Sequence, residues 1–333
     1  MSDTRPVAVT GLSVLTALGR GPEAQLSGEP VFSEVQRFDT SALRVRYAAL
    51  AAGTASLDEE LDLAIATACA QAGVDRSTTP LLLAMHAPPE CDFGAARIYT
   101  SACVSGSTAL ADAAALISSG RAERIVVAGA YLVEPYQFAL FDAGRALAYD
   151  NVIRPFSAQR RGTLLGDGVA AVVLEAGTGL AQLAGWGRAG DAHHPCQPAP
   201  DGRGLAAALQ RALQRAGVSP EQVGYVNANA TGTIFSDQAE AAALRTVFQT
   251  SPPVSSTKGL HGHALEASGV VEFVVTVQAL LEGKLPVNAG FLEPDPHCDI
   301  DLILDAPRNV QTHVAVSVNS AFGGANTALV VTA

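Results

Sequence analysis

The chain has 333 residues, 48% of them hydrophobic and only 16% charged, so it can bury a large core in one or two domains. Its net charge of -11 argues against nucleic acid or an anionic membrane surface as a partner, because both repel an acidic protein. No apolar run reaches transmembrane length, and the five cysteines form no CxxC pairs. We therefore expect a cytoplasmic protein with neither a disulfide framework nor a metal site.

Strands alternate with helices in the first half of the chain. Strands are predicted from continuous apolar runs, and helices from apolar segments that open on polar residues and end at glycine. The predicted segments are a strand over 6–11, a short strand within 38–50, a helix over 57–73, strands over 80–87 and 95–100, a helix from Cys103 to Gly120, a strand over 124–129 and a loosely helical segment over 138–148.

The second half follows the same alternation. The predicted segments are a loop over 155–168, a strand over 169–175, an exposed loop over 195–204, an amphipathic helix over 205–217, a strand over 223–228, a helix over 237–248 with Ser236 as its N-cap, an apolar helix over 265–282, and strands over 314–319 and 328–332. Apolar strands alternating with helices imply parallel sheets covered on both faces. A strand, a glycine-bearing loop and a returning strand occur at 125–174 and again at 314–331, which suggests two similar halves joined near residue 177.

One short stretch, Ser-Ala-Cys-Val-Ser-Gly around Cys103, stands at or just before the first turn of a mostly apolar helix. Unpaired backbone N–H groups and the positive end of the helix dipole would face its sulfur and favour the thiolate, the nucleophilic form. The small neighbours would let a substrate carbonyl come close. The alternative is a buried cysteine packed as a small hydrophobe, and this stretch alone favours neither reading.

Three later stretches are polar and rich in glycine, alanine or small residues inside apolar surroundings: 227–233, 255–263 and 319–324. The first follows a predicted strand, where open α/β sheets bind their ligands. Acyl transfer through a cysteine needs a nucleophile, a proton-handling group and N–H donors for an oxyanion. Cys103, His263 and these loops could supply them. Taken singly, each has a structural alternative: a packing histidine, a turn cap, or a surface pair of Lys258 and Glu240.

The stretch around Cys103 resembles the active-site motif of the elongating β-ketoacyl-acyl-carrier-protein synthases, members of the thiolase superfamily. Further motifs resemble that family in family order, at 7–19, 154–168, 191–204, 224–243, 255–269, 294–295 and 319–326. The resemblance covers nearly the whole chain, although residues 74–100 form a shorter segment than in typical members. It implies an α/β thiolase-type fold, with halves 1–177 and 178–333 forming a layered α-β-α-β-α sandwich. The first half would carry the nucleophilic cysteine, and the second the asparagine, lysine and histidine of the site.

The resemblance also implies an activity. Cys103 would take an acyl group as a thioester from acyl-carrier protein or coenzyme A and transfer it by Claisen condensation, in fatty acid or polyketide-type biosynthesis. Its backbone N–H, together with one from the loop of Ser320, Ala321 and Phe322, would form the oxyanion hole.

Further roles follow from the same resemblance. His263 falls on the second active-site histidine, and Lys258 and Glu240 fall on the family lysine and its carboxylate partner. Thr231 and Thr233 match the threonines that hold the phosphopantetheine arm. That arm belongs to the substrate, so no separate cofactor is expected. A homodimer is implied, or alternatively a heterodimer with another ketosynthase-like subunit.

The chain departs from the family pattern at several positions. Asn229 stands where the family has its first histidine, and asparagine carries no titratable proton. Cys-Asn-His is closer to the thiolase set, yet the final glycine loop has Ala321 and Phe322 and no second cysteine. Ser320 or Ala321 replaces the family's gating phenylalanine. His261 is an addition without an assigned role.

These departures leave two alternatives to condensation. The first is acyl transfer without decarboxylation, to an amine, alcohol, thiol or water. The second is a non-catalytic partner subunit that shapes the pocket of another ketosynthase. Such chain-length partners usually lack the cysteine, which is present here as Cys103.

Overall fold

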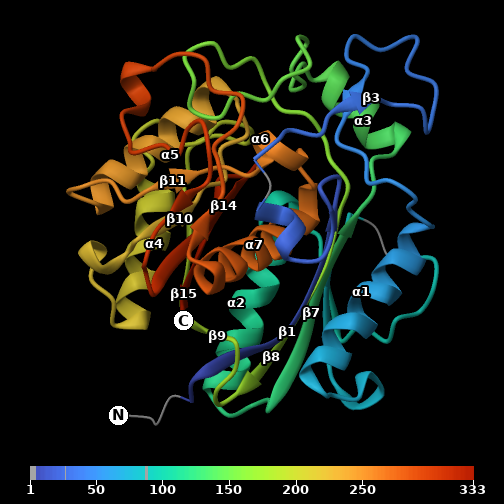
Figure 1. Cartoon of the computed structure of the whole chain (residues 1–333), viewed down its shortest axis with the longest axis vertical. Coiled ribbons are helices and arrows are strands. Elements are labelled where there is room, and N and C mark those ends of the chain that lie inside the picture. Colours follow the sequence, from blue (N-terminus) through green and yellow to red (C-terminus); the bar gives the residue numbers. More distant parts are fainter. Residues whose placement is uncertain (1–4, 27, 87–88) are drawn as a thin grey trace.

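The computed structural model describes residues 5–26, 28–86 and 89–333, and Figure 1 shows their arrangement. Its helices are α1 Leu57–Ala72, α2 Ser105–Ser118, α3 Pro135–Ala143, α4 Arg203–Ala216, α5 Ile234–Val247, α6 Lys258–His261 and α7 Ser268–Glu282. Its strands are β1 Val7–Thr16, β2 Gly19–Arg20, β3 Ser33–Glu34, β4 Tyr47–Ala48, β5 Leu81–Ala84, β6 Arg97–Tyr99, β7 Arg124–Tyr131, β8 Gly168–Ala176, β9 Ala181–Gly190, β10 Tyr225–Asn227, β11 Val254–Ser255, β12 Lys284–Leu285, β13 Arg308–Asn309, β14 Val314–Ala321 and β15 Ala325–Thr332.

Most strands join in one path of order β11-β10-β14-β15-β9-β1-β8-β7-β5-β6. The path has two matching arms that meet where β1 pairs with β9 through only two residue pairs. In each arm the outer strands are parallel, β6-β5-β7 and β11-β10-β14, and the inner ones are antiparallel. The repeated strand–loop–strand pattern of the sequence is therefore confirmed as β7–β8 and β14–β15. The division of the chain at residues 177 and 178 stays a prediction.

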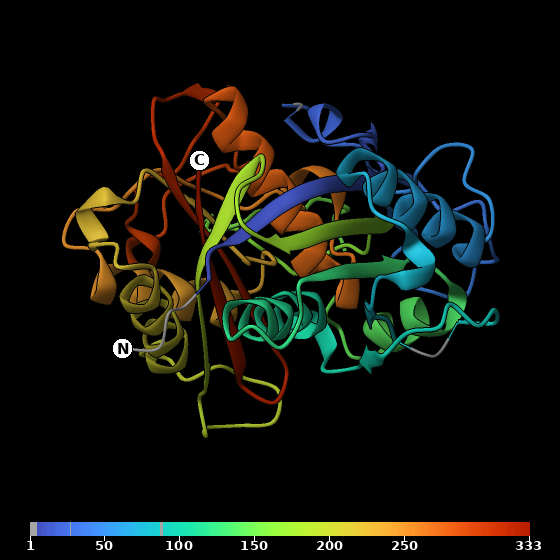
Figure 2. The same cartoon turned by 90° about the horizontal axis from the view of Figure 1, so that it is seen from below.

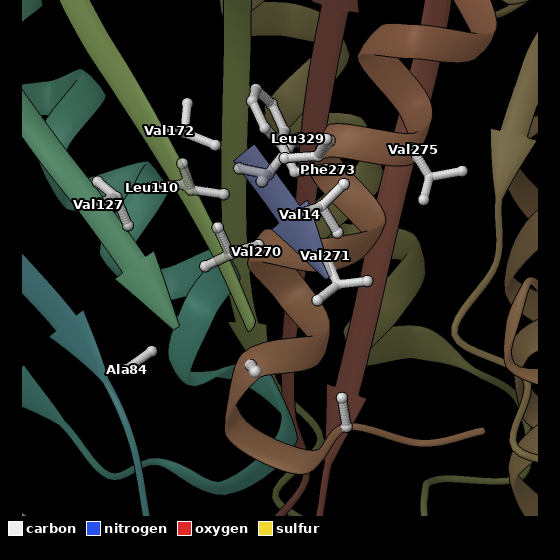
Figure 3. Packing of buried hydrophobic residues seen from close by; sticks show 14 of the residues in the cluster. Val14, Ala84, Leu110, Val127, Val172, Val270, Val271, Phe273, Val275 and Leu329 are labelled. Atoms are coloured by element: carbon white, nitrogen blue, oxygen red, sulfur yellow. The ribbon is translucent and has the colours of Figure 1, made fainter. Parts of the chain in front are cut away.

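Five layers follow from the helices. In Figures 1 and 2, α1 covers the outer face of one arm, α4 and α5 cover the other, and α2 and α7 run between the two arms. The central core lies around α2 and α7, and Figure 3 shows Leu110 and Phe273 of these helices among Val127, Val172 and Leu329 of the strands. Separate clusters fill the space beneath α4 and α5 and beneath α1. This is the predicted layered α-β-α-β-α sandwich of the thiolase type.

The expectation of purely parallel sheets was wrong. The chain returns from β7 to β8, and from β14 to β15, through connections that bring it back antiparallel. Apolar runs do not distinguish the two arrangements when helices bury both faces of a sheet. None of the helices in the described part of the chain is long and apolar enough to cross a membrane.

Several predicted boundaries shift because of local capping. The helix predicted over 138–148 is α3, which begins at Pro135 because the Glu134 side chain accepts hydrogen bonds from two N–H groups of the first turn. Ser236 is not an N-cap: α5 begins two residues earlier, after an extended Thr233. The strand predicted over 80–87 is β5, Leu81–Ala84, and the predicted end at Ala87 lies outside the described residues.

The helix predicted over 265–282 begins with a separate 3-10 turn, Leu265–Ala267, before α7. A matching 3-10 turn, Ala102–Val104, precedes α2. Residues 195–204 were predicted to be an exposed loop, which is only partly right. Ala199 is fully buried, and its N–H donates to the buried carboxylate of Asp191, 2.9 Å away.

Candidate active site

Cys103 lies in the 3-10 turn directly before α2, as predicted. Ala102 has a φ of 51°, a left-handed conformation that residues with a side chain rarely adopt, and it turns the chain sharply out of β6. The turn aims the Cys103 sulfur at the imidazole of His263, with Sγ 3.0 Å from Nε2. The reading of Cys103 as an inert packing residue is therefore the weaker one, because packing requires no such partner.

The start of α2 was expected to favour the thiolate of Cys103, and burial opposes that effect. Burial raises the pKa of the Cys103 thiol to about 12, and the negative charge of Glu266 raises it further, against a lowering by Lys258. Cys103 is 9% exposed, so little water reaches it to solvate a charge. The resting sulfur is a neutral thiol, and it needs a base to become a nucleophile.

His263 is placed to be that base. Burial lowers the pKa of its imidazole well below the usual value, and the charge of Lys258 lowers it further, so the ring rests neutral. Its Nδ1 is 2.9 Å from the hydroxyl of Ser268. With Nδ1 carrying the proton and donating to that hydroxyl, Nε2 is free to accept the thiol proton of Cys103.

Asn229 follows strand β10 and is held on two sides. Its backbone N–H donates to Glu240 Oε1, 2.7 Å away, and its side-chain Oδ1 accepts from Lys258 Nζ at 3.3 Å. Because the carbonyl end of the amide is taken, its Nδ2 is the free end, and no described residue accepts a hydrogen bond from it. An N–H donor is therefore present where the family has a histidine.

The predicted partnership of Lys258 and Glu240 was wrong. Lys258 Nζ instead bonds Glu272 Oε1, and Glu272 Oε2 accepts from Asn319 at 2.6 Å. Glu240 Oε1 instead accepts a hydrogen bond from the backbone N–H of Asn229. Burial raises the pKa of the Glu240 carboxyl to about 8. A fully buried ammonium needs a charged partner, and Glu272 on α7 is the carboxylate bonded to it. Burial raises the pKa of the Glu272 carboxyl, and the charge of Lys258 and the hydrogen bonds from Lys258 and Asn319 oppose that rise.

A cavity of about 70 Å³ lies in front of Cys103. Among the described residues that line it are eight of the ten predicted site residues: Cys103, Asn229, Thr231, Thr233, His263, Ser320, Ala321 and Phe322. The hydroxyls of Thr231 and Thr233 lie 3.1 Å apart. Phe322 is largely exposed at the entrance, at 56%. Lys258 does not line the cavity but lies behind Asn229, and Glu240 lines a smaller neighbouring one.

Sequence reasoning missed Ser268 and Glu272. A signal existed for both, since Glu272 is a carboxylate inside a strongly apolar helix and Ser268 opens that helix five residues after His263. His261 is buried, and neither of its ring nitrogens finds a partner among the described residues. Burial and then Lys258 lower its pKa to about 4, so its ring is neutral at physiological pH.

The described residues contain no group of three or more histidine, cysteine or carboxylate side chains that could hold a metal ion. The predicted chemistry rests instead on Cys103, His263 and N–H donors. These are the parts of a site that forms and breaks a thioester: a thiol, a neutral base beside it, and a cavity with a free amide donor.

Two family models match the chain. Residues 93–178 match the model described as "Beta-ketoacyl synthase, N-terminal domain", and residues 180–292 match "Beta-ketoacyl synthase, C-terminal domain". The chain belongs to the β-ketoacyl synthase family.

Curated relatives align with about two thirds of the chain. Nodulation protein E of Rhizobium meliloti is 40% identical over 243 residues, which are 69% of this chain and 60% of that protein. The 3-oxoacyl-[acyl-carrier-protein] synthase 2 of Synechocystis sp. is 35% identical over 246 residues, 69% of this chain and 59% of its own. The chain thus spans about three fifths of the length of the curated relatives that it matches.

Solved structures match over nearly the whole chain. A β-ketoacyl synthase from Burkholderia phymatum superposes with a TM-score of 0.87 at 25% identity, covering 98% of this chain and 99% of the other. The ishigamide ketosynthase/chain length factor superposes with a TM-score of 0.88 at 24% identity, covering 99% of each chain. These similarities establish the fold.

Proposed function

We propose that this chain is a β-ketoacyl synthase-type acyltransferase. It loads an acyl group from acyl-carrier protein or coenzyme A onto Cys103 and transfers it by Claisen condensation, in fatty acid or polyketide-type biosynthesis. The observation that carries the proposal is the 3.0 Å contact between Cys103 Sγ and His263 Nε2, at the edge of a cavity that also holds a free amide donor.

The loading of an acyl group onto Cys103 starts from a neutral Cys103 thiol and a neutral His263 imidazole. The Cys103 thiol passes its proton to His263 Nε2 as its sulfur attacks the carbonyl carbon of the incoming thioester. The carbonyl oxygen becomes an oxyanion, which the backbone N–H of Cys103 and one from the Ser320–Phe322 loop would stabilise. The bond to pantetheine then breaks, and His263 returns the proton to the departing pantetheine sulfur.

Transfer reverses the role of Cys103. The bond between the malonyl methylene carbon and its carboxylate breaks, carbon dioxide leaves, and the electron pair stays on that carbon as a carbanion. The carbanion attacks the carbonyl carbon of the acyl-Cys103 thioester, forming the new carbon–carbon bond while the bond to sulfur breaks. The departing Cys103 sulfur takes a proton from its surroundings, with His263 as the nearest relay. Thr231 and Thr233 line the same cavity, which supports the proposal that they hold the pantetheine arm.

The names of relatives suggest partners. One matched structure contains an acyl-carrier protein in complex with its ketosynthase, and two contain a ketosynthase with a chain length factor. For this chain we accordingly propose acyl-carrier protein as the donor, and a homodimer or a heterodimer with a second ketosynthase-like subunit.

The experiment is acyl loading followed by intact mass and peptide mapping, with hexanoyl-coenzyme A as the donor. Wild type should carry the acyl group on Cys103, and Cys103→Ala should lose both that adduct and any β-ketoacyl product. His263→Ala should slow loading of Cys103 by about 10² to 10⁴, the usual contribution of a general base. An unmodified Cys103 across a panel of acyl donors would instead favour the partner-subunit alternative.

Asn229 favours a second candidate, acyl transfer without decarboxylation to an amine, alcohol or water. An asparagine donates a hydrogen bond but does not supply a titratable proton as histidine does. Acylated enzyme given radiolabelled malonyl-carrier protein distinguishes the two candidates. Release of carbon dioxide with β-keto product supports condensation, and intact acyl transfer without either supports the alternative. In that second case, Asn229→His should gain decarboxylation.

A further inference from the structure

A second and much larger cavity lies between α1 and α3, on the side of the molecule where Figure 1 shows both helices. Its volume is about 1040 Å³, the size of a site for a small organic molecule. It lies at the carboxyl ends of two parallel strands, where Met85 and His86 follow β5 and Tyr131 ends β7. Open α/β sheets bind ligands at that end of their strands. No described residue lines both this α1–α3 cavity and the cavity of Cys103, so the two are separate.

The wall of the α1–α3 cavity suits a ligand with an apolar body. Apolar and aromatic side chains form much of it: Leu57, Leu63, Met85, Phe93, Leu132 and Tyr136. Phe93 already has a cation over its ring, the guanidinium of Arg76, whose central carbon is 5.4 Å from the ring centre. Tyr136 is 72% exposed and offers a second ring. Because the face of an aromatic ring attracts cations, the same wall also suits a positive charge.

The α1–α3 cavity is also strongly acidic. Against the one guanidinium of Arg76, six described carboxylates line it: Asp58, Glu59, Asp62, Glu90, Asp92 and Glu134. Of these six, only Asp62 forms an ion pair, with Arg76. Glu59 and Glu134 accept hydrogen bonds from backbone N–H groups at the starts of α1 and α3, and those bonds leave their negative charges in place. A cavity with this excess of one charge attracts a cation and repels an anion.

Tyr131 supplies a second, independent indication of a ligand. It lines the α1–α3 cavity and is 4% exposed, and its hydroxyl finds no partner among the described residues. Burial raises the pKa of this hydroxyl well above its ordinary value, and the charge of Glu134, another residue of the cavity wall, raises it further. The hydroxyl therefore stays protonated and lies close to Glu134. A buried hydroxyl without a partner is costly, so it indicates a ligand that bonds to it.

The carboxylate of Glu266 is a further unsatisfied group beside the same cavity. Its Oε1 lies 3.4 Å from Nδ1 of His86, which lines the cavity. Glu266 is 6% exposed, and its Oε2 has no partner among the described residues. An ionised carboxylate only accepts hydrogen bonds, so the missing partner is a donor.

We propose that the α1–α3 cavity binds a primary alkylammonium group. The charge lies among the carboxylates and donates to the hydroxyl oxygen of Tyr131, while the apolar body lies against Phe93 and Tyr136. An ammonium has three N–H donors and no acceptor, which matches the acceptor oxygens that the cavity leaves free. The group belongs either to a free amine or to the end of an acyl chain carried by Cys103. Only the second source rests on the proposed function.

The test measures binding of 4-phenylbutylamine to the whole chain by isothermal titration calorimetry, with 4-phenylbutanol as a neutral ligand of the same shape. The amine should bind saturably, and the alcohol about tenfold more weakly, because charge-assisted hydrogen bonds are the stronger ones. Cys91 locates the site, since it is free and exposed and lines the α1–α3 cavity. Bound amine should slow its alkylation by iodoacetamide. Alkylation of Cys196, which is also free and exposed but lines the cavity of Cys103, should not change.

Variants of the wall test the two interactions separately. Glu90→Gln/Glu134→Gln should weaken binding of the amine about tenfold, since one surface ion pair contributes up to about fivefold. The glutamine at 134 keeps an oxygen for the backbone N–H groups of α3. Tyr131→Phe should weaken binding about threefold without lowering the melting temperature, because the hydroxyl that it removes has no partner in the unliganded chain. Glu123→Gln, an exposed carboxylate outside the cavity, is the control.

A second experiment distinguishes the two sources of the ammonium. Equal binding of 4-phenylbutylamine by wild type and Cys103→Ala shows that a free amine binds without the nucleophile. Loading of Cys103 from 6-aminohexanoyl-coenzyme A is then compared with loading from hexanoyl-coenzyme A. A preference for the amino donor that Glu90→Gln/Glu134→Gln abolishes assigns the ammonium to the acyl chain.

The proposal is overturned if the free amine neither binds nor protects Cys91 and the amino donor has no advantage. Unchanged affinity in both wall variants also overturns it, as does protection of Cys91 that needs no amine and grows with protein concentration, since a second copy of the chain would then cover the cavity. The proposed function stands in each case if hexanoyl-coenzyme A still loads Cys103. Failure of every donor to load Cys103 overturns only the proposed function, because binding of the free amine is measured without loading.

Discussion

The two turn–helix units at the centre of the molecule, 102–118 and 265–282, share one backbone plan and carry different chemistry. Each begins with a residue in the left-handed region, Ala102 at φ 51° and Leu265 at φ 44°, and each passes through a 3-10 turn into a buried helix, α2 or α7. Aligned on these residues, the turns place Cys103 in one unit and Glu266 in the other. The nucleophile therefore occupies one of two equivalent places in the fold.

The helices of the two units cross at glycines that also correspond. A methyl group added to Gly106 would lie 2.7 Å from the backbone nitrogen of Val270, and one added to Gly269 would lie 2.3 Å from that of Ser107. Neither contact leaves room for a side chain. This close approach brings the start of α2, with Cys103, against the start of α7, with Ser268 and the preceding His263.

One buried position separates the two helices in the chemistry that they bring to the site. Six residues after Cys103, α2 has Ala109, and six residues after Glu266, α7 has Glu272, both without exposed surface. One unit therefore supplies Cys103, the proposed nucleophile, with an uncharged residue at this position, while the other supplies the carboxylate that holds Lys258 and, through it, Asn229. The comparison teaches that a duplicated backbone can divide a reaction between its copies by exchanging a few side chains.

The largest effect on stability is expected at the charged position of α7. Glu272→Gln leaves the fully buried Lys258 without a counter-charge, which costs about 3–5 kcal/mol in free energy of unfolding. Denaturant unfolding measures it, with Glu282→Gln at the exposed end of the same helix as the control. A loss below about 1 kcal/mol would show that Lys258 does not depend on this carboxylate.

The crossing glycines give the next effect. Gly106→Ala and Gly269→Ala should each destabilise the protein by about 1–3 kcal/mol, because the added methyl group meets backbone atoms that the core holds in place. Thermal or denaturant unfolding checks this. Gln214→Ala, on the exposed side of α4, is a helical control that should change stability little. Equal losses at both glycines support the equivalence of the two units, whereas tolerance at either would argue against it.

Glu266, the counterpart of Cys103 in the second unit, tests whether the two units influence each other electrostatically. Its charge raises the pKa of the Cys103 thiol, after the larger effect of burial, so Glu266→Gln should lower that pKa. Alkylation of Cys103 by iodoacetamide at pH 8, mapped by mass spectrometry, should therefore become several-fold faster, since the thiolate reacts. Glu123→Gln, an exposed carboxylate, is the control. An unchanged rate would mean that Glu266 does not influence the nucleophile.

The last prediction concerns the dependence of stability on pH and the carboxyl of Glu240. Burial raises its pKa to about 8 in the folded chain, against 4.5 as its ordinary value, so the folded state holds a proton that the unfolded state releases between these values. The stability that this proton provides is complete below about pH 4.5 and is lost as the pH rises through 8. Glu240→Gln, which keeps an oxygen for the Asn229 N–H, should flatten that decline in melting temperature between pH 5 and 8. An identical slope in the variant would contradict the shift.

Much of this could be predicted from the sequence. Apolar runs and glycine stops located most helices and the long strands, and the spacing around Cys103 placed it at the start of a helix. Motif order indicated the family and eight of the residues that line the cavity. These features depend on neighbours in the chain, so the local sequence determines them.

Only the tertiary structure decided the rest. The antiparallel inner strands, the pairing of Lys258 with Glu272 instead of Glu240, and the presence of Cys196 in the cavity all join residues that are distant in sequence. The state of Cys103 is the clearest case. Its position at a helix start favours a thiolate, but burial by the surrounding layers raises the pKa of the thiol to about 12. The base that we propose for it, His263, lies 160 residues away in sequence.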